Sequence, residues 1–135
     1  MIGLKTLVGG LCVATSMAQA TPIPVTPTEQ VRVFAICAGR FSALTEHQWL
    51  VDGPASEATE ELRAAFADLL DAVTPAAVQA GMPDTLAISL RIEAKAAQRE
   101  LLSLSLFAED ARDRARAAIA ARAKLDMCRG LILQG

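Results

Sequence analysis

The residues of this 135-residue chain that could do chemistry are its single histidine and the carboxylates close to it. His47 follows Glu46 directly and precedes Asp52, and a histidine beside carboxylates can be poised for proton transfer. The surrounding sequence marks neither a nucleophile nor an oxyanion-stabilising loop. We therefore expect a non-enzymatic protein, and an enzyme that uses His47 as general base is the second alternative.

The only tryptophan, Trp49, falls in the same short stretch as the only histidine. We interpret this stretch as a patch that meets a partner, made of Arg40, Glu46, His47, Trp49 and Asp52. The alternative is that Trp49 packs against the end of the fold, while Glu46 and His47 are solvated or cap a helix.

The sequence lacks the residue types and motifs of common metal and cofactor sites. A single histidine excludes the usual multi-histidine metal sites and the paired Glu-x-x-His motifs of di-iron bundles. The sequence also contains no C-x-x-C-H motif, no zinc-type cysteine spacing and no glycine-rich phosphate loop. We expect no metal and no cofactor.

The first twenty residues resemble a cleavable signal peptide. Lys5 provides a positive start, 7–14 is an apolar segment, and Ala18-Gln19-Ala20 is a small-residue cleavage site. The apolar segment is shorter than the roughly 20 residues that span a bilayer, so we expect no stable membrane insertion after cleavage. Residues 21–135 then form a single exported domain. Its expected location is the periplasm, with the extracellular space as the alternative.

Export determines how the cysteines are interpreted. Beyond Cys12 in the leader, the chain contains only Cys37 and Cys128, and an even pair in an oxidising compartment favours a disulfide. The alternative is two unpaired, buried thiols. A bond that closes a loop of about 90 residues could stabilise the fold by about 4 kcal/mol in the chain-entropy model.

The charge balance limits the classes of partner. Lys5 is the only charged residue of the leader, so its removal leaves a mildly acidic chain in which 15 Asp and Glu outnumber Lys and Arg. Such a chain has no general affinity for nucleic acid or for an anionic membrane. We expect a partner among other envelope proteins, and the oligomeric state stays open.

Apolar periodicity predicts four helices, over 27–50, 56–73, 84–105 and 109–130. The first has an N-cap at Thr26, proline at its first position and a buried stripe through Phe34, Cys37, Ala38, Phe41 and Leu44. Thr74-Pro75 is expected to end or kink the second helix, and 105–110 to separate the third from the fourth. Because no proline or glycine lies between Pro83 and Gly130, one continuous helix is the alternative. Alanine dominates the expected stripe of the fourth helix, which runs through Ala111, Ala115, Ala118, Leu125, Cys128 and Ile132.

Four helices with short connections predict an all-α fold, an antiparallel four-helix bundle in up-down-up-down order. In that order the end of the fourth helix lies beside the beginning of the first. Cys37 and Cys128 would then lie close together. The expected fold is therefore a bundle tied by one disulfide.

Leu44-Thr45-Glu46-His47-Gln48 resembles the LTxxQ motif of a family of small periplasmic, all-helical stress chaperones. Members of that family bind unfolded proteins in a dimeric cradle. The resemblance rests on one copy of the motif, where the family usually has two. It implies chaperone-like binding of unfolded or envelope proteins as the first alternative to an accessory or protein-interaction module.

Overall fold

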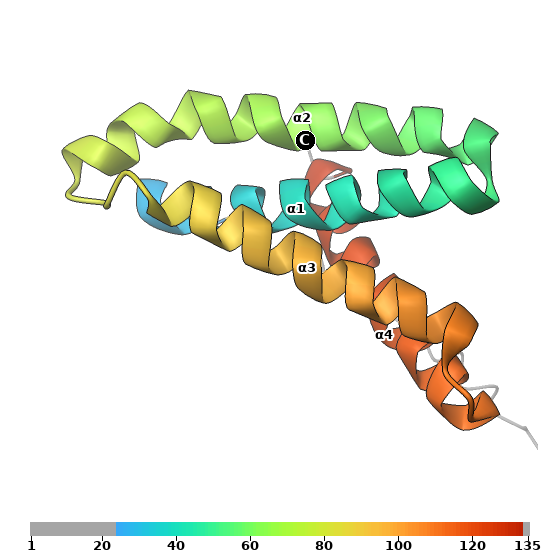
Figure 1. Cartoon of the computed structure of the whole chain (residues 1–135). Helices are drawn as coiled ribbons and strands as arrows, with labels where there is room; N and C mark the ends of the chain where they lie inside the picture. The colour runs from blue at the N-terminus through green and yellow to red at the C-terminus, as the bar shows by residue number, and fades with distance from the viewer. Residues whose placement is uncertain (1–23, 134–135) are drawn as a thin grey trace, which may run out of the picture.

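The computed structural model describes residues 24–133, so the expected signal peptide over 1–20 lies outside the described residues. The described part is all-helical and contains four helices (Figure 1). Their bounds are α1 Pro27–Val51, α2 Gly53–Gln79, α3 Leu86–Phe107 and α4 Ala111–Ile132. None of these helices is both long and apolar enough to cross a membrane.

The first two helices begin at side-chain caps. The Thr26 hydroxyl accepts a hydrogen bond from the Glu29 N–H at 3.3 Å, which confirms the expected start of α1. Asp52 both ends α1, by donating its N–H to the Gln48 carbonyl, and caps α2, by accepting from the Ala55 N–H at 3.4 Å. Asp52 alone therefore connects the two helices. α2 begins at Gly53, three residues before the predicted start.

Pro75 does not end α2, so the predicted end of this helix at residue 73 is wrong. The helix continues to Gln79, and the Thr74 hydroxyl donates to the Leu70 carbonyl at 2.6 Å one turn earlier. The chain leaves the helix through the cap residue Ala80 and then Gly81, whose φ of 96° suits glycine. There the Met82 N–H donates to the Ala77 carbonyl, as in a Schellman motif.

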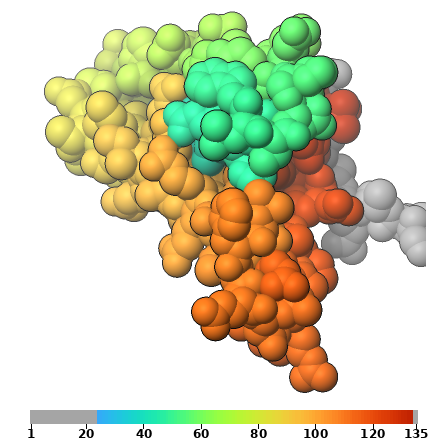
Figure 2. Space-filling view, turned by 45° about the vertical axis from the view of Figure 1, so that its right-hand side comes forward, coloured from blue at the N-terminus to red at the C-terminus, as the bar shows by residue number. Residues whose placement is uncertain are grey.

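The predicted break between the third and fourth helices is confirmed. It falls at 108–110, where an Asp110 carboxylate oxygen accepts from the N–H groups of Arg112 at 2.7 Å and Asp113 at 3.2 Å. Two of the four free N–H groups at the start of α4 are thereby satisfied. The end of α3 and the start of α4 project together beyond the other helices (Figure 2).

The helices do not pack as a closed up-down-up-down bundle. α1 lies between α2 and α3 and contacts both, whereas α4 packs on α3 and touches α1 at fewer positions (Figure 1). Within the described residues the backbone of α2 closely approaches that of no helix other than α1. In a closed bundle α2 would also pack on α3, so the observed fold is more open than expected.

The core follows this central position of α1. The rings of Phe41 and Phe66 stack with centroids 5.7 Å apart, and Phe34 packs against Phe66 at 6.2 Å, which joins α1 to α2. On the α3 side, Gly39 lies so close to the α3 backbone that an added Cβ would be 2.3 Å from the Arg91 carbonyl oxygen. Glycine in the middle of α1 therefore permits a close helix crossing.

The disulfide prediction is confirmed. The sulfurs of Cys37 and Cys128 lie 2.07 Å apart, with Cα atoms at 5.6 Å, and both residues are buried. The bond ties the first half of α1 to the end of α4, although these helices share few other contacts.

The expected stripe of α4 was partly wrong. α4 buries Leu125 and Cys128 as predicted, but its other buried residues are Ala117, Ala121 and Leu131. In α3 only Gln98 and Leu102 are buried. Gln98 faces α4, where its amide nitrogen donates to the Ala121 carbonyl at 3.2 Å.

Candidate functional site

A groove of about 420 Å³ lies between the C-terminal halves of α1 and α3. We call it the α1–α3 groove, and its lining residues are Ala43, Glu46, His47, Leu50, Arg99, Leu102, Ser103 and Phe107. Leu50 is 86% exposed and Phe107 is 77% exposed, so two large apolar side chains flank it in solvent. Isolated exposed apolar residues are ordinary, but apolar residues on both sides of a groove are typical of a binding surface.

Glu46 is held by two cations from α3. Its carboxylate accepts hydrogen bonds from the Lys95 ammonium and, at 3.0 Å, from the Arg99 guanidinium. The hydrogen bond from Lys95, supported by Arg99, lowers the pKa of Glu46 below its usual range despite partial desolvation. One carboxylate between two cations leaves a local excess of one positive charge at the edge of the groove.

His47 lines the groove and is partly buried. Ser103 lines the same groove, but among the described residues no hydrogen bond joins His47 to Ser103 or to Glu46. The Glu46 carboxylate is engaged by α3. A nucleophile, base and orienting carboxylate are therefore not assembled in this conformation.

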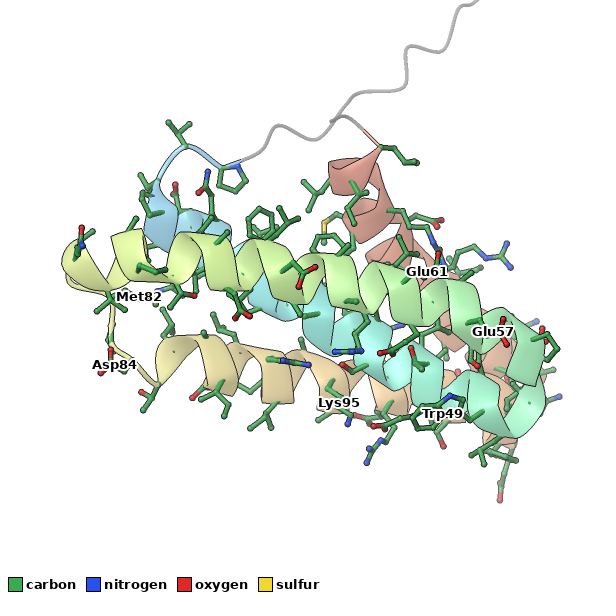
Figure 3. The ribbon with its side chains drawn as sticks, turned by 90° about the horizontal axis from the view of Figure 1, so that it is seen from above. Trp49, Glu57, Glu61, Met82, Asp84 and Lys95 are labelled. Carbon is green, nitrogen blue, oxygen red and sulfur yellow. A yellow bond between two sulfur atoms is a disulfide. The ribbon has the colours of Figure 1, made fainter. Side chains whose placement is uncertain are left out.

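Trp49 points into solvent near the turn that joins α1 to α2 (Figure 3). It is 64% exposed, which contradicts the alternative that it packs against the end of the fold. It lines a shallow depression next to the groove, together with Glu46, Lys95, Glu60 and Arg63. Glu46 lines both this depression and the α1–α3 groove, so Trp49 lies next to the groove.

The other two residues of the predicted patch lie apart from the groove. Asp52 caps α2 at the adjacent turn and is exposed, so its side chain has a structural role. Arg40 lies nearly two turns before Glu46 and reaches α4, where it donates to the Lys124 carbonyl at 3.2 Å. The structure thus brings together Glu46, His47 and Trp49, and places Arg40 elsewhere.

Sequence reasoning missed the two most exposed apolar residues of the groove. Leu50 was taken as the last residue of its helix, and Phe107 lay outside the predicted third helix, which ended at 105. A usable signal was present: Leu101, Leu102, Leu104, Leu106 and Phe107 are more apolar residues than one helix face can bury.

The residues of the chaperone-like motif lie within α1. Leu44 is buried, and the buried Thr45 hydroxyl donates to the Phe41 carbonyl at 2.9 Å. Leu44 and Thr45 therefore contribute to the packing of α1. His47, which lies within the same motif, lines the α1–α3 groove.

Comparison with protein-family models, with curated proteins and with solved structures finds no match to this chain. Within residues 24–133, no three histidine, cysteine, aspartate or glutamate side chains lie together in a way that could hold a metal ion.

Proposed function

We propose that this chain is an exported, non-enzymatic helical module that binds another protein of the cell envelope through the α1–α3 groove. The observation that carries the proposal is the groove itself, with Leu50 and Phe107 exposed at its sides. Large apolar side chains that lie in solvent around a concavity gain most from a partner, since burial contributes about 25 cal/mol per Å² of apolar surface.

The chemistry of the groove indicates the chemistry of the partner. Ala43, Leu50, Leu102 and Phe107 contribute apolar surface to the groove. At its edge, Lys95 and Arg99 together outweigh the single charge of Glu46. The partner segment is therefore an amphipathic one, with apolar anchors and at least one acidic residue that faces Arg99.

Export supports the envelope location in this proposal. Disulfides persist in oxidising compartments, and the Cys37–Cys128 bond joins the two ends of the described fold. The leader-like pattern over 1–20 directs the chain to the periplasm, with the extracellular space as the alternative. Mass spectrometry of the native protein should find a chain that begins at Thr21 and lacks free thiols at Cys37 and Cys128.

Site-specific cross-linking in living cells tests the partner. A photo-reactive phenylalanine analogue at position 107 should yield one dominant adduct, and Leu50→Arg in the same chain should abolish it. The same analogue at position 119 is the matched control, because Ile119 is 70% exposed on α4 outside the groove. The same adducts from positions 107 and 119, or an adduct that survives Leu50→Arg, would refute binding through the groove.

The chaperone-like alternative is favoured by the same exposed apolar groove, because unfolded chains offer apolar segments without a fixed sequence. It predicts a dimer that suppresses aggregation of a chemically denatured client, and loss of that activity in Phe107→Ser. Many weak adducts from position 107 would favour this alternative, whereas a single adduct favours a dedicated partner. The alternative of an enzyme with His47 as base predicts a reaction that His47→Gln abolishes.

A further inference from the structure

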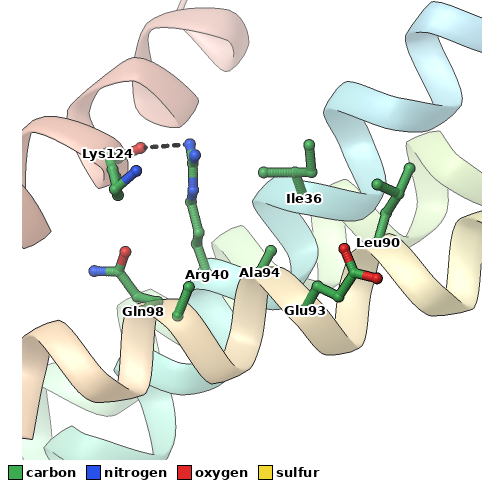
Figure 4. Close-up of a pocket in the computed structure, with 8 residues that line it drawn as sticks. Ile36, Arg40, Leu90, Glu93, Ala94, Gln98 and Lys124 are labelled. Atoms are coloured by element: carbon green, nitrogen blue, oxygen red, sulfur yellow. Dashed lines mark hydrogen bonds between the residues drawn. The ribbon is translucent and has the colours of Figure 1, made fainter.

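A separate pocket of about 250 Å³ lies where α1, α3 and α4 meet (Figure 4). Its lining residues are Ile36, Arg40, Leu90, Glu93, Ala94, Ala97, Gln98 and Lys124. It shares no lining residue with the α1–α3 groove. Any ligand of this pocket is independent of the partner proposed above.

Arg40 brings a positive charge to this pocket without a paired carboxylate. Its Nη1 donates to the Lys124 carbonyl at 3.2 Å and lies 3.6 Å from the Cys128 sulfur, and neither atom is an anion. None of the ion pairs formed among residues 24–133 includes Arg40. Because partial burial desolvates the guanidinium, the pKa of Arg40 is lowered. A half-buried cation of this kind gains from a bound anion.

Gln98 contributes a buried hydrogen-bond acceptor that lacks a donor. The side chain is 1% exposed, and its Nε2 donates to the Ala121 carbonyl at 3.2 Å. That bond orients the amide, because a flipped amide would place oxygen against oxygen. The Oε1 atom is then buried and has no hydrogen-bond partner among the described residues. An unpaired buried carbonyl costs free energy that an N–H or O–H donor would recover.

The remaining walls define the size and polarity of a ligand. Ile36, Leu90 and Ala94 form an apolar side, and Lys124 adds a second positive charge next to Arg40 (Figure 4). Glu93 lies toward the Leu90 end of the pocket in the same view, where its carboxylate would repel a second acid group. A volume of about 250 Å³ is below the usual range for drug-sized ligands, so the ligand is small.

We propose that this pocket binds a small α-amino or α-hydroxy carboxylic acid with an apolar side chain. The carboxylate accepts hydrogen bonds from Arg40 and lies near the Lys124 ammonium. The α-ammonium or α-hydroxyl group donates to Gln98 Oε1, and the apolar branch packs on the wall formed by Ile36 and Leu90. The unpaired charge of Arg40 and the unpartnered Oε1 of Gln98 are thereby satisfied by adjacent groups of one ligand.

Four probes that share one carbon skeleton separate the contribution of the carboxylate from that of the α-ammonium or α-hydroxyl group. The ¹⁵N-labelled, oxidised protein is titrated with L-leucine, 2-hydroxy-4-methylpentanoate, 4-methylpentanoate, which lacks the α-donor, and leucinol, which lacks the carboxylate. At least one of the first two should shift amide resonances of the pocket residues on α1, α3 and α4. Removing the α-donor should weaken binding about three- to tenfold, and removing the carboxylate about tenfold or more. Whether leucine or the hydroxy acid binds better identifies the natural class.

Variants test the assigned roles. Arg40→Met should weaken binding of the acid at least about tenfold, and Gln98→Met should remove the difference between the probes with and without the α-donor. Arg116→Gln is the matched control, since Arg116 is an exposed α4 arginine that pairs with Asp113 outside the pocket. Ala94→Leu fills the pocket and leaves Arg40 and Gln98 in place, so it should block binding even if Arg40→Met disturbs the fold.

Three results would overturn the proposal. The first is the absence of pocket shifts with all four probes, which would mean that the pocket binds none of these ligands. The second is binding of leucinol as tight as that of the acids. The third is wild-type affinity in a folded, disulfide-bonded Arg40→Met or Ala94→Leu protein.

Discussion

Replacing Gly39 by alanine should destabilise this protein, although alanine is the better helix former. An ideal Cβ at position 39 would lie 2.3 Å from the Arg91 carbonyl oxygen and 3.1 Å from the Lys95 nitrogen. Close carbon–oxygen contacts between helices are about 3.3 to 3.6 Å long. Both neighbours are backbone atoms, so α3 as a whole must withdraw from α1 by about 1 Å to reach such a distance.

The magnitude follows from two opposed effects. Alanine in place of glycine within a helix contributes about 1 kcal/mol of stability. Forcing an extra carbon into a packed interface costs about 1–3 kcal/mol, and a rigid backbone neighbour places this case near the upper value. The expected net loss in free energy of unfolding is therefore about 2 kcal/mol.

Gly130→Ala is the matched control, because Gly130 lies in α4 and a Cβ there would meet no atom within 4 Å. This variant should gain up to about 1 kcal/mol from helix propensity alone. Urea unfolding of the oxidised proteins, followed by circular dichroism, measures both values. If Gly39→Ala proved as stable as the natural protein, the close crossing of α1 and α3 would be refuted.

Two further perturbations test the covalent tie and the ion pairs. Replacing both Cys37 and Cys128 by alanine should lower the free energy of unfolding by about 4 kcal/mol, and reductant should then have no further effect on the variant; an unchanged urea midpoint would contradict the bond. Glu46→Gln should cost about 1 kcal/mol at neutral pH, since its pairs with Lys95 and Arg99 are partly exposed. Because the pKa of Glu46 is lowered in the fold, this contribution is present above the ordinary glutamate pKa and is lost as the pH falls through the folded value. The stability difference between variant and natural protein should therefore vanish in acid, and a difference that grows there would be incompatible with the assignment.

The features that sequence predicted well are those specified by local chemistry. Thr26 and Pro27 define a helix start through their own atoms, and Asp110 provides the cap at the α3–α4 break. The cysteine pairing needed only an oxidising compartment and an even count. None of these inferences depends on which helix lies beside which.

Helix faces were harder to predict where alanine replaces larger residues. Burying an alanine gains little apolar area, so the sequence of α4 barely distinguishes Ala117 and Ala121, which are buried, from Ala115 and Ala118, which are exposed. The burial of Gln98 was hard to predict for a different reason. Its burial depends on a carbonyl of α4, a partner that periodicity in α3 cannot reveal.

The error in the arrangement of the helices explains where the exposed surface lies. A helix buried on one side has one apolar stripe, whereas α1 buries Val31, Ala35 and Ala43 in addition to the predicted stripe. Apolar or small residues on more than one face of a helix are the sequence signature of a central helix. The sequence of α1 already contains this pattern. Because α1 lies between α2 and α3, those two helices do not cover each other, and the side of α3 that a closed bundle would pack against α2 lacks that neighbour. The α1–α3 groove and the Arg40 pocket both lie where α3 meets its neighbours, so a closed bundle, in which α3 packs on α2 and α4, would have rearranged the surfaces on which both binding proposals depend.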